Sequence, residues 1–173
     1  GKVLMDMGTD EFASTMVIQN DQKIVVAGFH GSGSVVDFAV TRFNPDGSLD
    51  NSFGTNGTTT TDFASSVDVP NDMIIQDDGK IVVSGFSNAG STFTMAIARY
   101  NADGTLDPGF GVGGAVATSG SYGSAVGNGI HAQPDGKLLL CGYYNNGVDN
   151  DLLIARLNTD GTLDNSFSYD GFA

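Results

Sequence analysis

Three short acidic segments carry the residues with the clearest chemical potential. Each segment reads Asp-Gly-Ser/Thr-Leu-Asp with a phenylalanine three residues later, and its two aspartates are candidate carboxylate ligands for Ca²⁺. A calcium loop normally supplies about six or more oxygens from alternating positions, whereas these carboxylates flank an apolar leucine. We therefore predict Asx-turns and no resident cofactor. The aspartate pairs are Asp46 and Asp50, Asp103 and Asp107, and Asp160 and Asp164.

An arginine ends an expected strand shortly before each acidic segment. Arg42, Arg99 and Arg156 could form a ring of guanidinium groups for an anionic ligand, or Arg–Asp pairs that fix one module to the next. Recurrence favours the structural role, because a scaffold must make every joint alike. The recurring aromatic residues are predicted to fill the gaps between modules. These are Phe53, Phe110 and Phe167.

Residues that do not recur are the better candidates for ligand contact. His131 stands where the equivalent positions hold Val17 and Ile74, on a strand expected to line a central axis. A loop rich in tyrosine and asparagine could stack on a sugar ring and hydrogen-bond to it. The absence of tryptophan weighs against a lectin. The candidate ligand-binding residues are His131, Tyr143, Tyr144, Asn145 and Asn146.

The sequence contains no recognisable catalytic constellation. No serine lies in a nucleophile elbow, and no P-loop, dinucleotide fingerprint or Cys/His zinc spacing occurs. Cys141 lies in the apolar run 138–142 and is predicted to be a buried thiol. We predict that the protein is not an enzyme, while paired carboxylates for glycan cleavage remain an alternative.

The elements that position these residues follow a repeat of 57 residues, the interval between Arg42, Arg99 and Arg156. The second copy predicts strands over 73–76, 81–86, 94–100 and 115–118, separated by Asp-Gly and Asn-Ala-Asp-Gly turns. No segment has helical periodicity. We predict an all-β fold, a β-propeller of three four-stranded blades over about 16–61, 73–118 and 130–173, forming one array over 1–173.

Three blades are too few to close a ring, since known propellers have at least about four. The chain is therefore predicted to be half of a six-bladed ring, as a homodimer or as part of a longer propeller chain. The strand before each Asp-Gly turn is expected to be innermost. The third blade would lack an outer strand, and residues 2–5 would supply it as a closing strand.

The charge balance restricts the possible partners. The chain has 20 acidic and 7 basic residues and a formal net charge of -13, which disfavours nucleic acid and anionic membranes. No apolar stretch approaches the roughly 18 residues that a membrane helix needs. Low lysine and glutamate with abundant asparagine, threonine and glycine indicates an exported protein, located outside the cell or on its surface.

The chain resembles the bacterial delta-60 repeat in two kinds of motif. One is Gln-Pro-Asp-Gly-Lys-Leu-Leu-Leu-Cys-Gly at 133–142, and the other is Asn-Pro-Asp-Gly-Ser-Leu-Asp-Asn-Ser-Phe-Gly at 44–54. The resemblance implies a β-propeller in large exported or cell-surface bacterial proteins without an established activity. We predict a non-enzymatic structural or protein-interaction scaffold. The alternative is a glycan-binding or glycan-active propeller with its site at a ring mouth.

Overall fold

The computed structural model describes residues 1–63, 67–88, 90, 92–119 and 123–173, and this part of the chain is all-β. Its strands form three units that follow the repeat. Unit 1 consists of β1 (Asp10–Ile18), β2 (Ile24–Ser32), β3 (Val35–Phe43) and β4 (Thr58–Thr61). Unit 2 consists of β5 (Val67–Ile75), β6 (Ile81–Asn88), β7 (Phe93–Tyr100) and β8 (Ala115–Thr118). Unit 3 consists of β9 (Ser124–Ala132), β10 (Leu138–Asn145) and β11 (Asn150–Leu157). A search of the same residues for a helix that could cross a membrane finds none.

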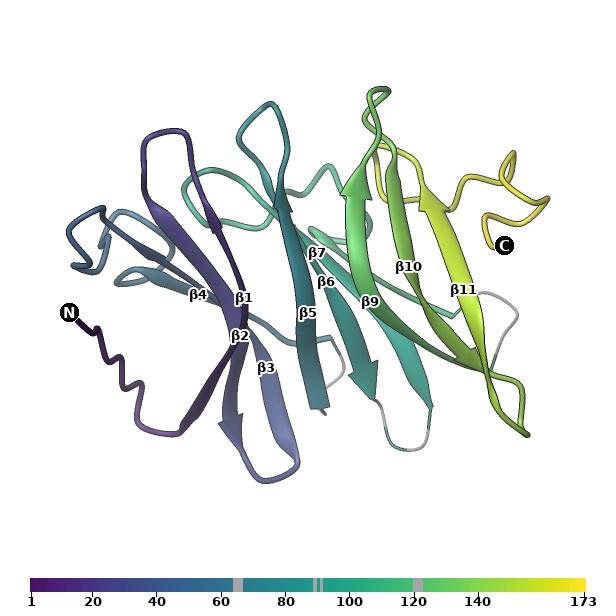
Figure 1. The fold of residues 1–173 in the computed structure, drawn as a ribbon, viewed down its shortest axis with the longest axis horizontal. Coiled ribbons are helices and arrows are strands. Elements are labelled where there is room, and N and C mark those ends of the chain that lie inside the picture. Colours follow the sequence, from purple (N-terminus) through teal and green to yellow (C-terminus); the bar gives the residue numbers. More distant parts are fainter. Residues whose placement is uncertain (64–66, 89, 91, 120–122) are drawn as a thin grey trace.

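Each unit is an antiparallel meander, and the units follow one another as an open array (Figure 1). One parallel bridge between Val36 and Val67 joins units 1 and 2 into an eight-stranded sheet, while unit 3 is a separate three-stranded sheet. The all-β prediction is confirmed. The array of one chain does not close into a ring.

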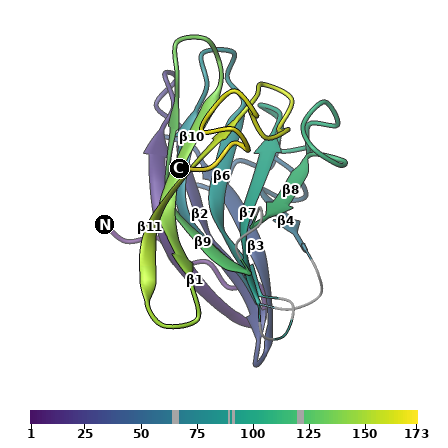
Figure 2. The same ribbon diagram turned by 90° about the vertical axis from the view of Figure 1, so that its right-hand side faces the viewer.

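The first strand of each unit lies on one side of the array. β1, β5 and β9 run side by side in Figure 1, and Figure 2 shows β4 and β8 at the opposite side. Polar contacts tie β5 to β9: Asn71 Nδ2 donates to the Gly127 carbonyl at 2.8 Å, and the Ile130 amide donates to Asp72 Oδ2 at 2.9 Å. The strands before the first hairpin turns therefore lie together at one side of the array, and their place innermost in a ring stays a prediction.

The inner strands begin earlier than predicted because each contains an irregularity that hides its pattern. In unit 2 the predicted strand is 73–76, whereas β5 already begins at Val67 and shifts register between Pro70 and Asp72. An extra residue at such a bulge breaks the alternation of apolar and polar side chains. The short outer strand β8, which is regular, has the predicted bounds 115–118, and β4 ends at Thr61, the predicted end of the first blade.

The recurring glycine of the second strand is required by this irregularity. A Cβ at Gly85 would lie 2.0 Å from the Val69 carbonyl oxygen, and a Cβ at Gly28 or Gly142 would lie 1.8 Å from the equivalent carbonyl. No side chain fits at these distances. The glycine therefore lets two strand backbones approach each other at the bulge.

The hydrophobic core consists of two layers between the units. We call the side of a unit that is turned toward the preceding unit its N-side face, and the opposite side its C-side face. In the first layer Val25, Phe38 and Phe53 of unit 1 pack with Met73 and Tyr100 of unit 2. The second layer repeats this packing with the equivalent residues of units 2 and 3. These are Val82, Met95 and Phe110 against Ile130 and Leu157.

Two features of unit 3 differ from the predictions. The prediction of a buried thiol is wrong, because Cys141 is exposed on the C-side face, where the equivalent Ala27 and Ser84 are covered by the next unit. Unit 3 also has the beginning of an outer strand, since Phe172 bridges to Ala155 and Ala173 exchanges backbone hydrogen bonds with Ile154. Residues 2–5 form no strand in the single chain, and their role as a closing strand stays a prediction.

Replacement of the bulge glycine tests this account. We expect Gly85→Ala to lower the free energy of unfolding by about 3 kcal/mol or more, because the methyl group displaces the β5 backbone. Gly123→Ala is the control, since a Cβ there meets nothing within 4 Å, and it is expected to change stability by less than about 0.5 kcal/mol. Urea unfolding followed by circular dichroism measures both. Equal stability of the two variants would contradict the bulge as the reason for the glycine.

Candidate functional site

Each acidic segment closes a polar joint around the recurring arginine. In unit 2, Arg99 Nε donates to Asp107 Oδ2 at 2.7 Å, and Lys80 Nζ lies 3.0 Å from the same oxygen. The Arg99 guanidinium carbon lies 4.5 Å from the ring centroid of Phe110. Its Nη1 donates to the Thr159 carbonyl of unit 3 at 2.6 Å. One side chain therefore organises its own unit and also binds the next one.

The joint recurs in the other units with nearly the same geometry. Arg42 Nε lies 2.7 Å from Asp50 Oδ2, and its Nη1 donates to the Ala102 carbonyl of unit 2 at 2.6 Å. Arg156 Nε lies 2.6 Å from Asp164 Oδ2. In the described part of the chain Arg156 has no carbonyl of a following unit to bind, and its side chain is 22% exposed, compared with 8% for Arg42. The structural interpretation of the arginines agrees with these contacts.

The joint carboxylates are held in their charged form. The Ser52 hydroxyl and then Lys23 hold the pKa of Asp50 well below its usual range, and Lys137 and then Ser166 do the same for the pKa of Asp164. Burial opposes the lowering of the pKa of Asp107, but hydrogen bonds from Lys80 and the Gly109 amide outweigh it. These aspartates are therefore ion-pair partners at neutral pH.

The first aspartate of each acidic segment makes the expected turn. Asp46 Oδ1 accepts hydrogen bonds from the Ser48 amide at 2.9 Å and the Ser48 hydroxyl at 2.6 Å. Asp103 and Asp160 make the same pair of contacts with Thr105 and Thr162. These contacts lower the pKa of each of the three carboxyls, the hydroxyl contributing most. Protein donors therefore already hold an oxygen of each carboxylate considered for calcium.

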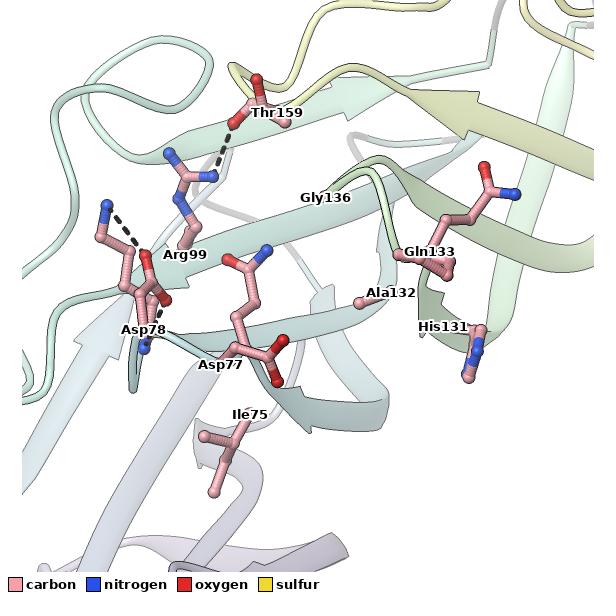
Figure 3. Close-up of a pocket in the computed structure, with 12 residues that line it drawn as sticks. Ile75, Asp77, Asp78, Arg99, His131, Ala132, Gln133, Gly136 and Thr159 are labelled. Carbon is pink, nitrogen blue, oxygen red and sulfur yellow. Dashed lines mark hydrogen bonds and ion pairs between the residues drawn. The ribbon is translucent and has the colours of Figure 1, made fainter.

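His131 lines a pocket between units 2 and 3, at the end of the array that carries the Asp-Gly turns. The pocket is open to solvent and also has Gln76, Asp77, Arg99 and Gln133 in its wall. Figure 3 shows His131 apart from Asp77 and Arg99, with its ring directed away from them. The arginine is committed to Asp107 and Thr159, so the pocket does not combine an imidazole and a cation at one point.

The tyrosine and asparagine candidates lie in the β10–β11 hairpin, at the other end of unit 3. Tyr143 and Tyr144 are consecutive in a strand and point to opposite faces, and Tyr144 packs against the core. Asn145 Nδ2 donates to Asn150 Oδ1 at 2.8 Å, while the Asn146 side chain binds Asp149 and closes the turn. The asparagine amides hold the hairpin together, and the two aromatic rings do not form one stacking platform.

A cluster that the sequence analysis did not identify lies where unit 1 passes into unit 2. Asp37 of β3, Asp62 after β4 and Asp68 of β5 each have a carboxylate oxygen within 4.8 Å of the others. Burial, followed by the charges of Asp62 and Asp68, raises the pKa of Asp37. Burial also raises the pKa of Asp68, although hydrogen bonds from Phe63 and Ser87 oppose this. The available signal was that the equivalent positions at the next junction, residues 94, 119 and 125, carry no acidic side chain.

Comparison with known families agrees with this architecture. The family described as "Domain of unknown function (DUF5122) beta-propeller" has a sequence model that matches residues 19–53, 76–110 and 133–167. The chain belongs to this β-propeller family. Each match begins at the glutamine before the first hairpin turn of the unit and ends at the phenylalanine of the arginine joint. The family defined by these residues has no assigned function, and no curated protein matches the chain.

Removal of one joint should destabilise the array. We expect Arg99→Met to lower the free energy of unfolding by about 3 kcal/mol, because Asp107 and the Thr159 carbonyl lose their donor. Asp78→Asn is the control: Asp78 is 57% exposed and 3.6 Å from Lys80, so its loss of charge should change stability by less than about 0.5 kcal/mol. Thermal and urea unfolding measure the difference. An Arg99→Met variant as stable as the control would contradict the joint.

The joints also predict a dependence of stability on pH. A carboxyl with a lowered pKa in the folded state stabilises the protein above its unfolded pKa of about 4, and this contribution is lost as pH falls through the folded pKa. We therefore expect the melting temperature to fall between pH 5 and pH 3. Asp107→Asn removes one such group, so the difference between this variant and the wild type should shrink over the same interval. A difference independent of pH would contradict the lowered pKa.

Proposed function

We propose that this chain is a non-enzymatic β-propeller module that acts as a structural or protein-interaction scaffold outside the bacterial cell. We further propose that two copies pair head to tail into a ring of six units. One observation carries the proposal of pairing: the two end faces of the array are the two halves of an interface that already occurs twice within the chain.

The N-side face of unit 1 is an interface without its partner. Met16 is 59% exposed, whereas the equivalent Met73 of unit 2 is 3% exposed. Ile24 and Phe43 are partly exposed at positions where unit 2 has the fully buried Ile81 and Tyr100. The side chains are of the same kind, and only the covering unit is missing.

The C-side face of unit 3 offers the complementary half. Leu152 is 73% exposed, and its equivalents Phe38 and Met95 are fully buried. Phe167 is partly exposed at a position where Phe53 and Phe110 are fully buried. This face corresponds to the side that units 1 and 2 each turn toward the next unit. A second copy that presented its unit 1 here would bury the same positions.

Polar groups at the end of unit 3 fit the same partner. Between units, Arg99 Nη1 binds the Thr159 carbonyl, and the Gly111 amide donates to the Asp160 carbonyl at 2.7 Å. The equivalent donors of unit 3 are Arg156 Nη1 and the Ser168 amide, and Ser168 has a φ of 49°, close to the 55° of Gly111. In a second copy the equivalent acceptors would be the carbonyls of residues 45 and 46.

The N-terminal residues fit the proposed ring as well. Ala173 of the outer strand of unit 3 and Lys2 are equivalent positions of the repeat, so residues 3–5 of a second copy would continue that strand. In the single chain this segment lies beside the N-side face of unit 1, yet Val3 and Leu4 remain 56% and 83% exposed. The segment does not cover the face, which supports a second copy as the occupant.

Two features support a scaffold without catalysis, and a third bears on its location. Six of the seven basic side chains occupy recurring positions and bind the joint aspartates, so they serve the array. The joint carboxylates are held charged by these donors, whereas a general acid or base needs a pKa near the working pH. The acidic composition, low in lysine, supports a location outside the cell.

Light scattering over a dilution series tests the proposed ring. We expect a molar mass of twice the 17.8-kDa chain, and we expect Met16→Asp to yield the monomer because it places a charge in the new interface. Val112→Asp is the control, since Val112 is 90% exposed in a turn near β8 and should leave the dimer intact. A wild-type monomer at about 100 μM would refute the ring, and a dimeric Met16→Asp variant would refute this interface.

A further inference from the structure

The carboxylates of Asp37, Asp62 and Asp68 meet at the junction of units 1 and 2, from three separate segments of the chain. Asp68 is fully buried, Asp37 is partly buried and Asp62 is exposed. The cluster therefore reaches from the interior to solvent, which gives a small ion a path of entry.

Asp68 accepts hydrogen bonds from Phe63 and Ser87, but one oxygen of Asp68 and one oxygen of Asp37 are buried without a partner among the described residues. The Phe63 amide donates to Asp68 Oδ2 at 2.8 Å, but the buried Oδ1 of Asp68 has no partner within the described residues. The Oδ1 of Asp37 is also buried and unpartnered within the same part of the chain. Buried polar atoms almost always have a hydrogen-bond partner, and a bound ion is one of the few explanations for an exception.

The protein supplies little positive charge to the cluster. The recurring lysines and arginines bind the joint aspartates, and no described lysine or arginine forms an ion pair with Asp37 or Asp68. A basic group beside the cluster is His30, the cross-strand neighbour of Asp37, and it favours the charged form of that carboxylate. His30 itself contacts Thr9 and lies 3.6 Å from Glu11. Asp37 and Asp68 thus have one weak cation beside them.

The three aspartates do not recur together at the junction of units 2 and 3, although Asp151 of unit 3 is equivalent to Asp37 and Glu11 of unit 1 is equivalent to Asp68. At the junction of units 2 and 3 the equivalent positions are Thr94, Ser119 and Ala125, which carry no charge. Units 2 and 3 nevertheless pack through the same kind of core layer as units 1 and 2. The packing of two units therefore does not require the three aspartates, and their presence at one junction needs a separate explanation.

We propose that Asp37, Asp62 and Asp68 bind one Ca²⁺ ion. Calcium takes oxygen ligands at about 2.3–2.6 Å, so two ligands on opposite sides of the ion lie roughly 5 Å apart, which suits the spacing of this cluster. Water completes the coordination on the exposed side at Asp62. Binding neutralises most of the local charge and ties β3 to the start of β5, so the ion acts as a clamp between units 1 and 2.

Calcium binding to the purified protein tests the proposal. Titration calorimetry with CaCl₂ should show one site per chain. At about 100 times the dissociation constant, Ca²⁺ should raise the melting temperature by about 5–10 °C relative to EDTA. Equimolar MgCl₂ should raise it much less, because Mg²⁺ requires a smaller and more regular oxygen cage.

The matched variant copies the uncharged junction of the same chain. Asp37→Thr, Asp62→Ser and Asp68→Ala together introduce the residues of the second junction, and this variant should fold in EDTA but show no calorimetric signal with CaCl₂. Asp62→Asn alone provides a milder test, with at least about tenfold weaker binding expected from the loss of one carboxylate. Asp46→Asn, in an acidic turn, should bind as the wild type does.

Three results would overturn the proposal. One is the absence of a calorimetric signal and of a thermal shift with CaCl₂ for the wild type. The second is an equal thermal shift for the wild type and for Asp62→Asn. The third is a wild type whose melting temperature does not change with CaCl₂ but rises when the pH is lowered from 7 to 5. This result would show that the aspartates share protons in place of a metal ion. Since the test measures binding within one chain, its failure is distinguishable from failure of the proposed ring.

Discussion

The architecture depends on one constraint, namely that a single guanidinium must satisfy an aspartate in its own unit and a carbonyl in the next. The planar group of Arg99 has donors in fixed directions, and its partners Asp107 and Thr159 lie in different units. Lysine carries one point of charge and cannot fix two directions at once. The position of each unit relative to the next therefore follows from one side chain, and Phe110 against the guanidinium restricts it further.

Much of the fold and of the arginine joint could be predicted from the sequence, because these features are local or recur. The hairpin turns and the Arg–Asp pairs each involve residues near one another in sequence and appear in every copy, and units 1 and 2 both have the short outer strand. The early start of β5 could not be predicted, because its bulge is a property of pairing: the reason for Gly85 is the Val69 carbonyl on another strand. Cys141 illustrates a different limit, since its apolar neighbours indicated burial but no further unit covers that face.

The aspartate cluster lies outside what the repeat could reveal. Asp37 and Asp68 come together only because the single parallel bridge at Val36 and Val67 brings β3 beside β5. Non-recurring aromatic and imidazole side chains were predicted to contact a ligand, whereas no aspartate of this cluster was. His131 and Tyr144 proved to lie at opposite ends of unit 3, in separate pockets. Non-recurrence identified candidates, and only the fold showed which of them are neighbours.

The equivalence of the N-side and C-side faces has a consequence for how such chains evolve. When every unit carries both halves of one interface, duplication or loss of a 57-residue segment by unequal recombination leaves each remaining contact intact. A new copy meets its neighbours through side chains that already fit, so the number of units can change in one genetic event without compensating substitutions. Individual junctions are then free to acquire different residues. The junction between units 1 and 2 has acquired its aspartates in this way.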